Sequence, residues 1–231
     1  MELIWEGINE TFWLIISMDR LVMEIAFRTV WISSLAVGLA TLIGLPLGTL
    51  LARTAFPGRR LAVLVFRAGM AVPTVFVGVV CYAIFSRLGP LGALELVYTP
   101  WVIVVGELLL AMPIIVSISH GAIKALDPRV SQVALTLGAS PMRRWRTYIS
   151  EARVGVTLAI LTAFARCVTE LGIAMMVGGN IAGRTRTLST ATALKISKGE
   201  FGSGLAVGLI LLIIALLVTS LIVAMSREEK D

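Results

Sequence analysis

The sequence predicts an all-α, polytopic membrane protein with about five transmembrane helices. Hydrophobic residues occupy 58% of the 231 positions and charged residues only 15%, whereas a soluble domain averages roughly 45–50% and about 25%. Mean hydropathy is correspondingly high, at +0.94. A spanning helix needs about 20 mostly apolar residues. Five segments satisfy this requirement: residues 22–52, 61–85, 100–123, 154–177 and 204–225.

The first 20 residues predict an amphipathic helix that lies at the membrane interface. Acidic and large aromatic residues alternate there, as in Glu6, Glu10, Phe12 and Trp13. This mixture is typical of a helix at a membrane surface, and it lacks the basic start and cleavage site of a signal peptide. We therefore expect an interfacial helix over residues 1–20 and a single transmembrane domain over residues 21–231.

The distribution of basic residues predicts the orientation. They fall in two groups, one around the first connection between spans and one between the third and fourth spans: Arg53, Arg59, Arg60, Arg67, then Lys124, Arg129, Arg143, Arg144, Arg146 and Arg153. Cytoplasmic loops are enriched in Lys and Arg, so both connections are expected in the cytoplasm, beneath the plasma (inner) membrane of a prokaryote. Five spans then place the N-terminus outside and the C-terminus inside. The net charge of +6 follows from this topology and does not indicate a nucleic-acid partner.

The chain lacks the patterns of an enzyme or a metal centre. Cys81 and Cys167 both fall in predicted spans, and His120 is the only histidine, too few ligands for a metal site of standard spacing. The G-x-x-x-x-G-K-[ST] pattern of a phosphate-binding loop is absent. We expect no cofactor in this chain, and any uphill transport would take its energy from a partner chain.

Residues 127–151 predict a helical hairpin in a cytoplasmic loop. Asp127-Pro128 and Ser140-Pro141 each join an N-cap residue to a proline at the first helical position. Gly138 lies between them, where a left-handed residue ends a helix. Apolar residues recur at helical spacing on the first helix: Val130, Val133, Ala134 and Leu137. An apolar stripe outside the bilayer favours a docking element; a loop that only fixes topology and contacts lipid headgroups would explain the basic residues alone.

Residues 132–140, Q-V-A-L-T-L-G-A-S, resemble the EAA loop of ABC-importer permeases, which inserts into a groove of the ATPase subunit. Ala134 and Gly138 match the family pattern, whereas Gln132 and Val133 replace its usual Glu and Ala. Where the family commonly shows Ile-x-Leu-Pro, this chain has Tyr148, Ile149, Ser150 and Glu151. The S-E-A-R ending at residues 150–153 resembles the subgroup of tungstate-type oxyanion permeases. The resemblance implies a set of ATPase-coupling residues: Gln132, Ala134, Leu137, Gly138, Ala139 and Ser140.

Residues 178–201 form a second candidate site, which the topology places on the outer side. Lys and Arg are enriched in cytoplasmic loops, so basic residues on the outer side run against this rule. Their presence there indicates a specific role at this place in the chain. Cations interleaved with threonine hydroxyls suit a tetrahedral dianion, while a basic turn contacting headgroups or a partner protein accounts for them equally well. Together with a charged pair in the fourth span, the candidates for the translocation path or for contact with a binding protein are Arg166, Glu170, Gly179, Asn180, Thr185, Arg186 and Thr187.

The pattern G-G-N-I-x-G-x-T-R-T-L at residues 178–188, followed by K-G-x-F at 198–201, is similar to the corresponding segment of tungstate permeases. This resemblance implies the type I ABC importer permease (MetI-like) fold. It also implies a homodimer that imports tungstate together with a cytoplasmic ABC ATPase dimer, which binds ATP and Mg²⁺, and an extracytoplasmic oxyanion-binding protein. Molybdate and sulfate permeases share this architecture and remain alternatives. An ion-driven anion carrier and a structural membrane anchor are hypotheses of a different class.

Ionisable residues at membrane depth complete the candidates: Arg28, Arg67, Glu107, Arg166 and Glu170. Each costs roughly 2.5–3.5 kcal/mol at a helix centre, so these residues are expected to face protein or water rather than lipid. Arg166 and Glu170 have the i, i+4 spacing that allows pairing on one helix face. The pair either neutralises itself or lines the translocation path.

Overall fold

The computed structural model describes residues 2–17 and 19–227, and these ranges contain helices and no strand. The helices are α1 (Glu2–Ile16), α2 (Arg20–Arg53), α3 (Arg59–Gly69), α4 (Thr74–Phe85), the short 3-10 helix η1 (Gly92–Leu94), α5 (Pro100–Lys124), α6 (Pro128–Thr136), α7 (Pro141–Glu151), α8 (Arg153–Val168), α9 (Gly172–Gly178), α10 (Leu188–Ser197) and α11 (Phe201–Arg227). Parts of two predicted segments, residues 1 and 18 of the interfacial helix and residues 228–231 of the cytoplasmic tail, lie outside the described residues.

Among the described residues, three helices are long and apolar enough to cross a membrane: α2, α5 and α11. Two bent pairs raise the number to five if each pair counts as one span, namely α3 with α4, bent by 105°, and α7 with α8, bent by 74°. The predicted all-α polytopic fold is therefore confirmed. Two of the five predicted spans, however, are not continuous helices.

The predicted span 61–85 divides into α3 and α4 at residues 70–73. Pro73 immediately precedes α4; it has no N–H to continue the hydrogen bonds of α3 and disfavours a helical residue before it. The predicted span 154–177 divides into α8 and α9. There the Glu170 carboxylate accepts a hydrogen bond from the N–H of Ile173 at 3.0 Å, which satisfies one donor at the start of a new helix. Hydropathy stays high across both breaks and does not reveal them.

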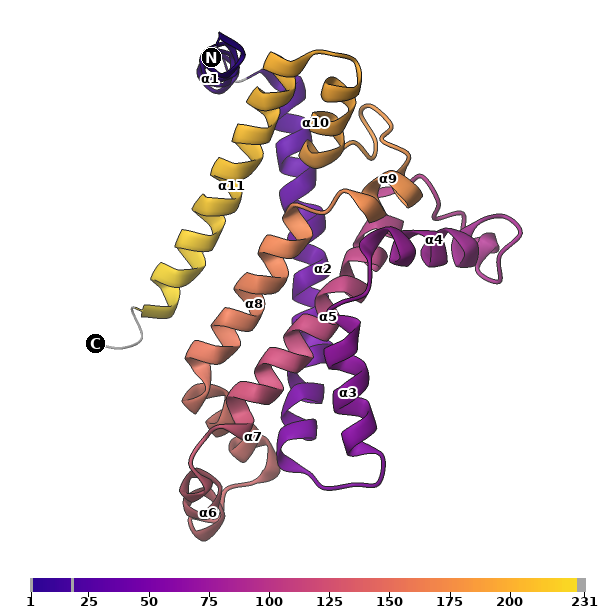
Figure 1. Cartoon of the computed structure of the whole chain (residues 1–231). Helices are drawn as coiled ribbons and strands as arrows, with labels where there is room; N and C mark the ends of the chain where they lie inside the picture. The colour runs from indigo at the N-terminus through magenta and orange to yellow at the C-terminus, as the bar shows by residue number, and fades with distance from the viewer. Residues whose placement is uncertain (1, 18, 228–231) are drawn as a thin grey trace.

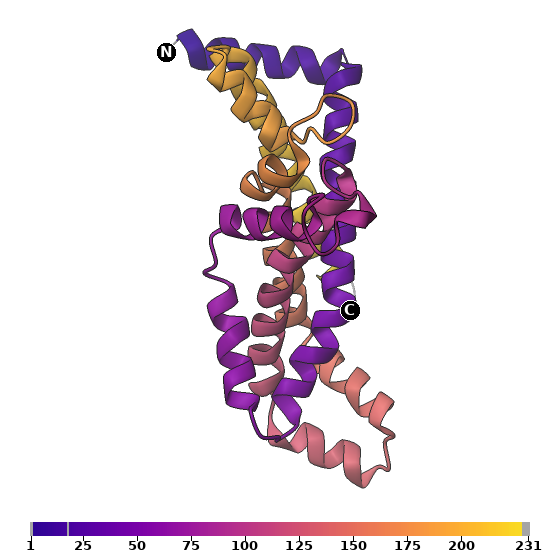
Figure 2. The ribbon, with the colours of Figure 1, turned by 90° about the vertical axis from the view of Figure 1, so that its right-hand side faces the viewer.

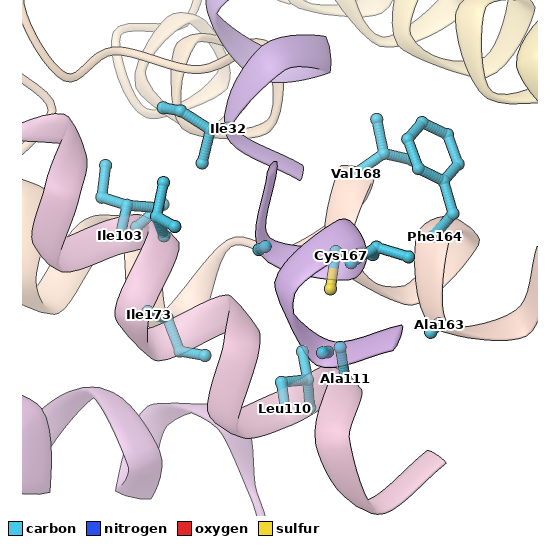
Figure 3. Packing of buried hydrophobic residues seen from close by; sticks show 14 of the residues in the cluster. Ile32, Ile103, Leu110, Ala111, Ala163, Phe164, Cys167, Val168 and Ile173 are labelled. Carbon is cyan, nitrogen blue, oxygen red and sulfur yellow. The ribbon is translucent and has the colours of Figure 1, made fainter. Parts of the chain in front are cut away.

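Helices α2 and α5 pack closely at the centre of the bundle. Gly44 and Gly48 of α2 face α5, and a Cβ at Gly44 would lie 3.1 Å from the Ile115 side chain. Small residues at these positions let the two backbones approach. The largest buried cluster joins these helices to α8 and α9 (Figure 3) and includes Ile32, Ile103, Leu110, Ala111, Phe164, Cys167, Val168 and Ile173.

The two ends of the bundle carry different structures. The α6–α7 hairpin lies at one end, and α1 and α10 lie at the other (Figure 1). Helix α1 runs across its end of the bundle against α11 (Figure 2), where the Ser203 hydroxyl donates to the Glu10 carboxylate at 2.5 Å. Its large residues Trp5, Phe12 and Trp13 are exposed, so the helix presents an apolar surface away from the bundle.

Candidate functional site

The α6–α7 hairpin has the capped geometry that the sequence predicts. The Asp127 carboxylate accepts the N–H of Arg129 at 2.8 Å, and the Ser140 hydroxyl accepts that of Arg143 at 3.4 Å. Gly138 connects the helices with a φ of +66°, a left-handed value that glycine adopts without steric cost. The predicted arrangement of helix, glycine turn and helix is confirmed.

Part of the predicted apolar stripe is exposed on the hairpin. Val133 and Leu137 are 54% and 79% exposed, and both line a groove of about 500 Å³ between α6 and α7. Ala134 lines the same groove but is buried, while Val130 also packs towards the bundle. The remaining predicted coupling residues lie along the same element, exposed or half-buried: Gln132, Gly138, Ala139 and Ser140. The hairpin therefore offers an apolar groove with a basic rim to a partner.

A buried tyrosine, Tyr148 of α7, joins the hairpin to the bundle. Its hydroxyl lies 2.9 Å from that of Ser131 in α6, and the guanidinium carbon of Arg53 lies 4.5 Å from its ring centroid, within the range of a cation–π contact. Arg53 also donates to the carbonyl oxygen of Ile123, near the end of α5, at 2.9 Å. Helices α2, α5, α6 and α7 therefore meet at this junction.

The same junction sets the pKa of Tyr148. Burial raises the pKa of the phenol, but hydrogen bonds with Ser131 and Arg144 and the positive charges of Arg144 and Arg53 lower it, and the net pKa is below the ordinary value. The sequence analysis missed the roles of Tyr148 and Arg53, because their contact joins residues far apart in the chain. The only signal was that Tyr148 begins the stretch in which this chain departs from Ile-x-Leu-Pro.

Gly178 and Gly179 end α9 and allow the chain to reverse. Gly179 has a φ of +68°, and a Cβ there would lie 2.7 Å from the ring of Tyr98, so this position requires glycine for two reasons. The Thr185 hydroxyl closes the reversal. It donates to the carbonyl oxygen of Gly178 at 2.6 Å and accepts the N–H of Ile181 at 2.9 Å.

Asn180, Arg186 and Thr187 also form hydrogen bonds inside this segment. Arg186 donates to the side-chain oxygen of Asn180 at 3.1 Å and to its carbonyl oxygen at 3.3 Å. Thr187 caps α10 in a reciprocal arrangement with Thr190. Both Thr185 and Thr187 are buried, so the hydroxyls that the sequence offered as anion donors are engaged within the fold. Arg184 remains exposed.

Two adjacent residues of α2, Arg28 and Thr29, hold the segment against the bundle. The Arg28 guanidinium donates to the carbonyl oxygens of Gly183 at 3.0 Å and Arg186 at 3.1 Å. The Thr29 hydroxyl accepts the N–H of Leu188 at 2.9 Å. Arg28, singled out as an ionisable residue at membrane depth, thus uses its charge to bind backbone carbonyls of the segment.

Replacing Thr185 by valine is expected to destabilise the protein by about 1–3 kcal/mol, because a buried carbonyl oxygen and a part-buried N–H lose their partner while the side-chain shape is kept. Serine keeps the hydroxyl and should be milder. Thermal unfolding of both variants in detergent micelles measures the difference. An unfolding temperature of the valine variant equal to that of the unmodified protein would show that these bonds contribute nothing.

Arg166 and Glu170 form the pair that their spacing predicts, with Nη1 and Oε2 3.2 Å apart. The Arg166 side chain is 45% exposed, whereas that of Glu170 is 1% exposed. Because Glu170 also accepts the N–H of Ile173, its carboxylate joins α8 to the start of α9. Glu107 is buried in the bundle interior, as predicted.

A cavity of about 600 Å³ lies beside the glycine-rich segment. It is lined by Arg184 from the segment and by Arg87, Glu95 and Tyr98 from the loop between α4 and α5, with Tyr82 of α4. The sequence analysis did not single out this loop, because nothing in its pattern connects it to residues 178–188. The cavity opens two arginines and two phenols to a partner at this end.

The predicted site residues therefore form two separate groups. The hairpin residues lie at one end of the bundle, and residues 179–187 lie near the other (Figure 1). Arg166 and Glu170, at the end of α8, belong to the second group, because Ser189 of α10 donates to the Glu170 carbonyl oxygen at 2.7 Å. Helices α2, α5 and α8 connect the two groups.

Residues 44–230 match the family described as "Binding-protein-dependent transport system inner membrane component". The chain is similar to the tungstate uptake system permease proteins TupB of Peptoclostridium acidaminophilum, with 33% identity over 99% of this chain and 100% of the relative, and of Campylobacter jejuni, with 34% identity over 93% and 90%. Its fold is similar to a chain of the inward-facing MetNI methionine ABC transporter, with a TM-score of 0.74 and 20% identity over 92% and 97%. The chain therefore belongs to the binding-protein-dependent transport system inner membrane components, the permease subunits of ABC importers.

Proposed function

We propose that this permease imports tungstate. The observation that carries the proposal is its similarity, over nearly the whole chain, to two tungstate uptake permeases. The segment whose pattern resembles tungstate permeases also occupies a defined place, because Arg28 and Thr29 fix it to α2. Its exposed arginine, Arg184, borders the 600 Å³ cavity together with Arg87. Positive charge at this entrance favours an anionic cargo or the protein that delivers it.

In this proposal the α6–α7 hairpin docks in a groove of a cytoplasmic ATPase dimer that binds ATP and Mg²⁺. The exposed Val133 and Leu137 support this role, because an apolar groove outside the bilayer needs a covering surface. Closure of the ATPases on ATP would push the hairpin, and the junction at Tyr148 would pass the motion to α2 and α5. Hydrolysis would then reset the hairpin. Coupling is thus mechanical, and this chain needs no nucleotide of its own.

The functional unit in this proposal is a homodimer. Helix α4 is bent by 105° from α3 and projects sideways from the bundle (Figure 1). It exposes Val75 and Phe76, and the adjoining α9 exposes Met175 and Met176. A second copy that covers these helices would place the translocation path between the two protomers, next to α8 and α9.

The proposed orientation places the hairpin in the cytoplasm and residues 178–201 outside, where an oxyanion-binding protein would deliver its cargo. The basic residues of the hairpin support it through the enrichment of Lys and Arg in cytoplasmic loops. Helix α1 would then lie in the outer interface, with Trp5, Phe12 and Trp13 among the lipids. The N-terminus is outside and the C-terminus cytoplasmic in this arrangement.

Uptake of each anion tests the proposal directly. Cells with and without the chain are supplied with tungstate, and cell-bound tungsten is measured in the presence of excess molybdate or sulfate. Uptake is expected to disappear without the chain, and to resist sulfate more than molybdate, whose dianion resembles tungstate more closely. If molybdenum uptake depends on the chain and tungsten uptake does not, the molybdate alternative is correct.

A second arm separates the ATP-driven permease from an ion-driven carrier. The chain is reconstituted in liposomes alone, under an ion gradient, and separately with its ATPase and ATP. The proposal expects transport only with the ATPase. Transport by the chain alone would favour the carrier, and transport in neither arm would favour a structural anchor.

A further inference from the structure

Three buried N–H groups converge at the end of α2 and the start of α7. They are Nε of Arg53, Nε of Arg144 and Nε1 of Trp145, and no described residue accepts a hydrogen bond from any of them. All three residues line one cleft of about 340 Å³ between the two helices. Buried donors without an acceptor destabilise a fold, so their gathering in a single cleft calls for a ligand that accepts hydrogen bonds.

The charge of the cleft defines the class of ligand. It contains two guanidinium groups, and the described residues that line it include no carboxylate. The hydroxyls of Thr49 and Thr54, which also line it, already donate to carbonyl oxygens of their own helix at 2.9 and 2.6 Å. Their hydrogens are therefore already used, and the free donors of the cleft are the N–H groups of Arg53, Arg144 and Trp145, two of which belong to positively charged side chains.

The Arg53 side chain is held in place before any ligand binds. The Tyr148 ring lies under the Arg53 guanidinium, and the Ile123 carbonyl oxygen accepts from one of its other nitrogens at 2.9 Å. Arg144 and Trp145 follow each other on α7, which is fixed to the bundle through the same tyrosine. Preorganised donors of this kind bind an anion with little loss of side-chain entropy.

We propose that this cleft binds a tetrahedral oxyanion through Arg53, Arg144 and Trp145. Arginine and indole N–H groups are suited to the oxygens of a phosphate or a similar dianion. Such an anion comes either from the headgroup of a phospholipid or from solution. The cleft is larger than a single tetrahedral anion, and the apolar side chains of Pro46 and Leu50 on one wall leave room for part of a lipid.

The site is distinct from the surface assigned to the ATPase. On α7, the 500 Å³ groove is lined by Arg143, Thr147 and Glu151, whereas the cleft is lined by Arg144, Trp145 and Tyr148. Successive helical residues point about 100° apart, so these are two faces of one helix. The bound oxyanion would bridge α2 and α7 and brace the hairpin against the bundle, whatever solute the permease carries.

Binding to the purified full-length chain in detergent micelles tests the site. Soluble phosphate and tungstate are titrated by calorimetry, and phosphatidylglycerol is titrated by native mass spectrometry against a galactolipid without phosphate. We expect Arg144→Gln to weaken binding about ten- to a hundredfold, the effect of losing a charged hydrogen bond. Trp145→Phe keeps the aromatic ring and removes only the N–H, so it should weaken binding several-fold and leave thermal unfolding unchanged.

Arg146→Gln provides the matched control, because Arg146 is an exposed arginine of the same helix that does not line the cleft. It should leave binding unchanged. Phosphatidylglycerol binding without soluble-anion binding identifies a lipid headgroup as the ligand, and binding of the soluble anions identifies a free oxyanion. Absence of both, equal binding of the galactolipid, or equal losses in Arg146→Gln and the cleft variants would overturn the proposal.

Discussion

Replacing Gly138 by valine is expected to reduce ATP-driven uptake about tenfold or more while ATP hydrolysis continues. Gly138 has a φ of +66° between α6 and α7, a conformation that costs an ordinary L-residue roughly 1–2 kcal/mol and a β-branched residue more. Apart from Gly138 and its two chain neighbours, no described residue has an atom within 4 Å of the Cβ position, so the effect is conformational and not a steric clash. A valine would favour a different backbone at the turn and shift α6 relative to α7, which breaks the link between the ATPase and the bundle.

Uptake and ATP hydrolysis measured in the same proteoliposomes check this expectation. Gly58→Val is the matched control, because Gly58 also has a positive φ, of +84°, and open space around its Cβ position, but lies outside the hairpin. Asparagine tolerates left-handed conformations, so Gly138→Asn should retain most of the uptake. Full uptake by Gly138→Val, or an equal loss in Gly58→Val, would remove the turn from the coupling mechanism.

The success of the sequence at the hairpin has a local cause. Asp127, Ser140 and Gly138 act on backbone groups within three residues of themselves, and the two prolines fix the first turns of α6 and α7. Such short-range chemistry is visible in a linear pattern. The predicted stripe was less accurate, because the choice between Val133, which is exposed, and Ala134, which is buried, depends on where the bundle lies.

Two of the predicted spans are interrupted in the structure, one at Pro73 and one at Glu170. A hydropathy average reflects the composition around Pro73 but not the bend of 105° between α3 and α4. It likewise reflects the composition around Glu170 but not the hydrogen bond from the Ile173 N–H to the Glu170 carboxylate at the start of α9. The sequence also paired Arg166 with Glu170 correctly, because that contact spans one helical turn. It could not pair Arg53 with Tyr148 or Arg28 with residues 183 and 186, since those contacts depend on the packing of separate helices.

For residues 178–201 the sequence selected candidate residues but left their hydrogen-bond partners open. The sequence offered Thr185 and Thr187 as hydroxyl donors to an anion. In the structure the Thr185 hydroxyl donates to the Gly178 carbonyl oxygen, and the Thr187 side chain caps α10. Arg186 likewise binds Asn180. A residue pattern that is characteristic of one substrate class can thus consist of residues that hold their own segment in shape by hydrogen bonds. Under the proposed function, the segment would act by holding its exposed arginine, Arg184, and its glycine reversal in a fixed place.

If the segment acts by holding Arg184 in a fixed place, Arg28 is the decisive anchor of residues 181–187. Replacing Arg28 by methionine removes two charged hydrogen bonds, to Gly183 and Arg186, and leaves two carbonyl oxygens without their donor. Each such bond contributes about 1.5–3 kcal/mol when well sheltered, but the site is partly exposed, so we expect a combined loss of about 2–3 kcal/mol. Thr29 still holds Leu188, so α10 should stay in place while residues 181–187 loosen.

Hydrogen exchange and uptake together distinguish this anchor from a general effect on stability. Exchange at residues 181–187 is expected to accelerate in Arg28→Met, and uptake should fall with it. Arg20→Met is the matched control on the same helix, because Arg20 forms an exposed pair with Glu24 one turn away on α2 and its loss should leave both quantities unchanged. Arg28→Lys keeps the charge but not the two-pronged geometry, and an intermediate exchange rate is expected. If exchange at residues 181–187 stays slow in Arg28→Met, the loop does not depend on Arg28, and the hydrogen bonds of Thr185 and Arg186 within the segment hold it.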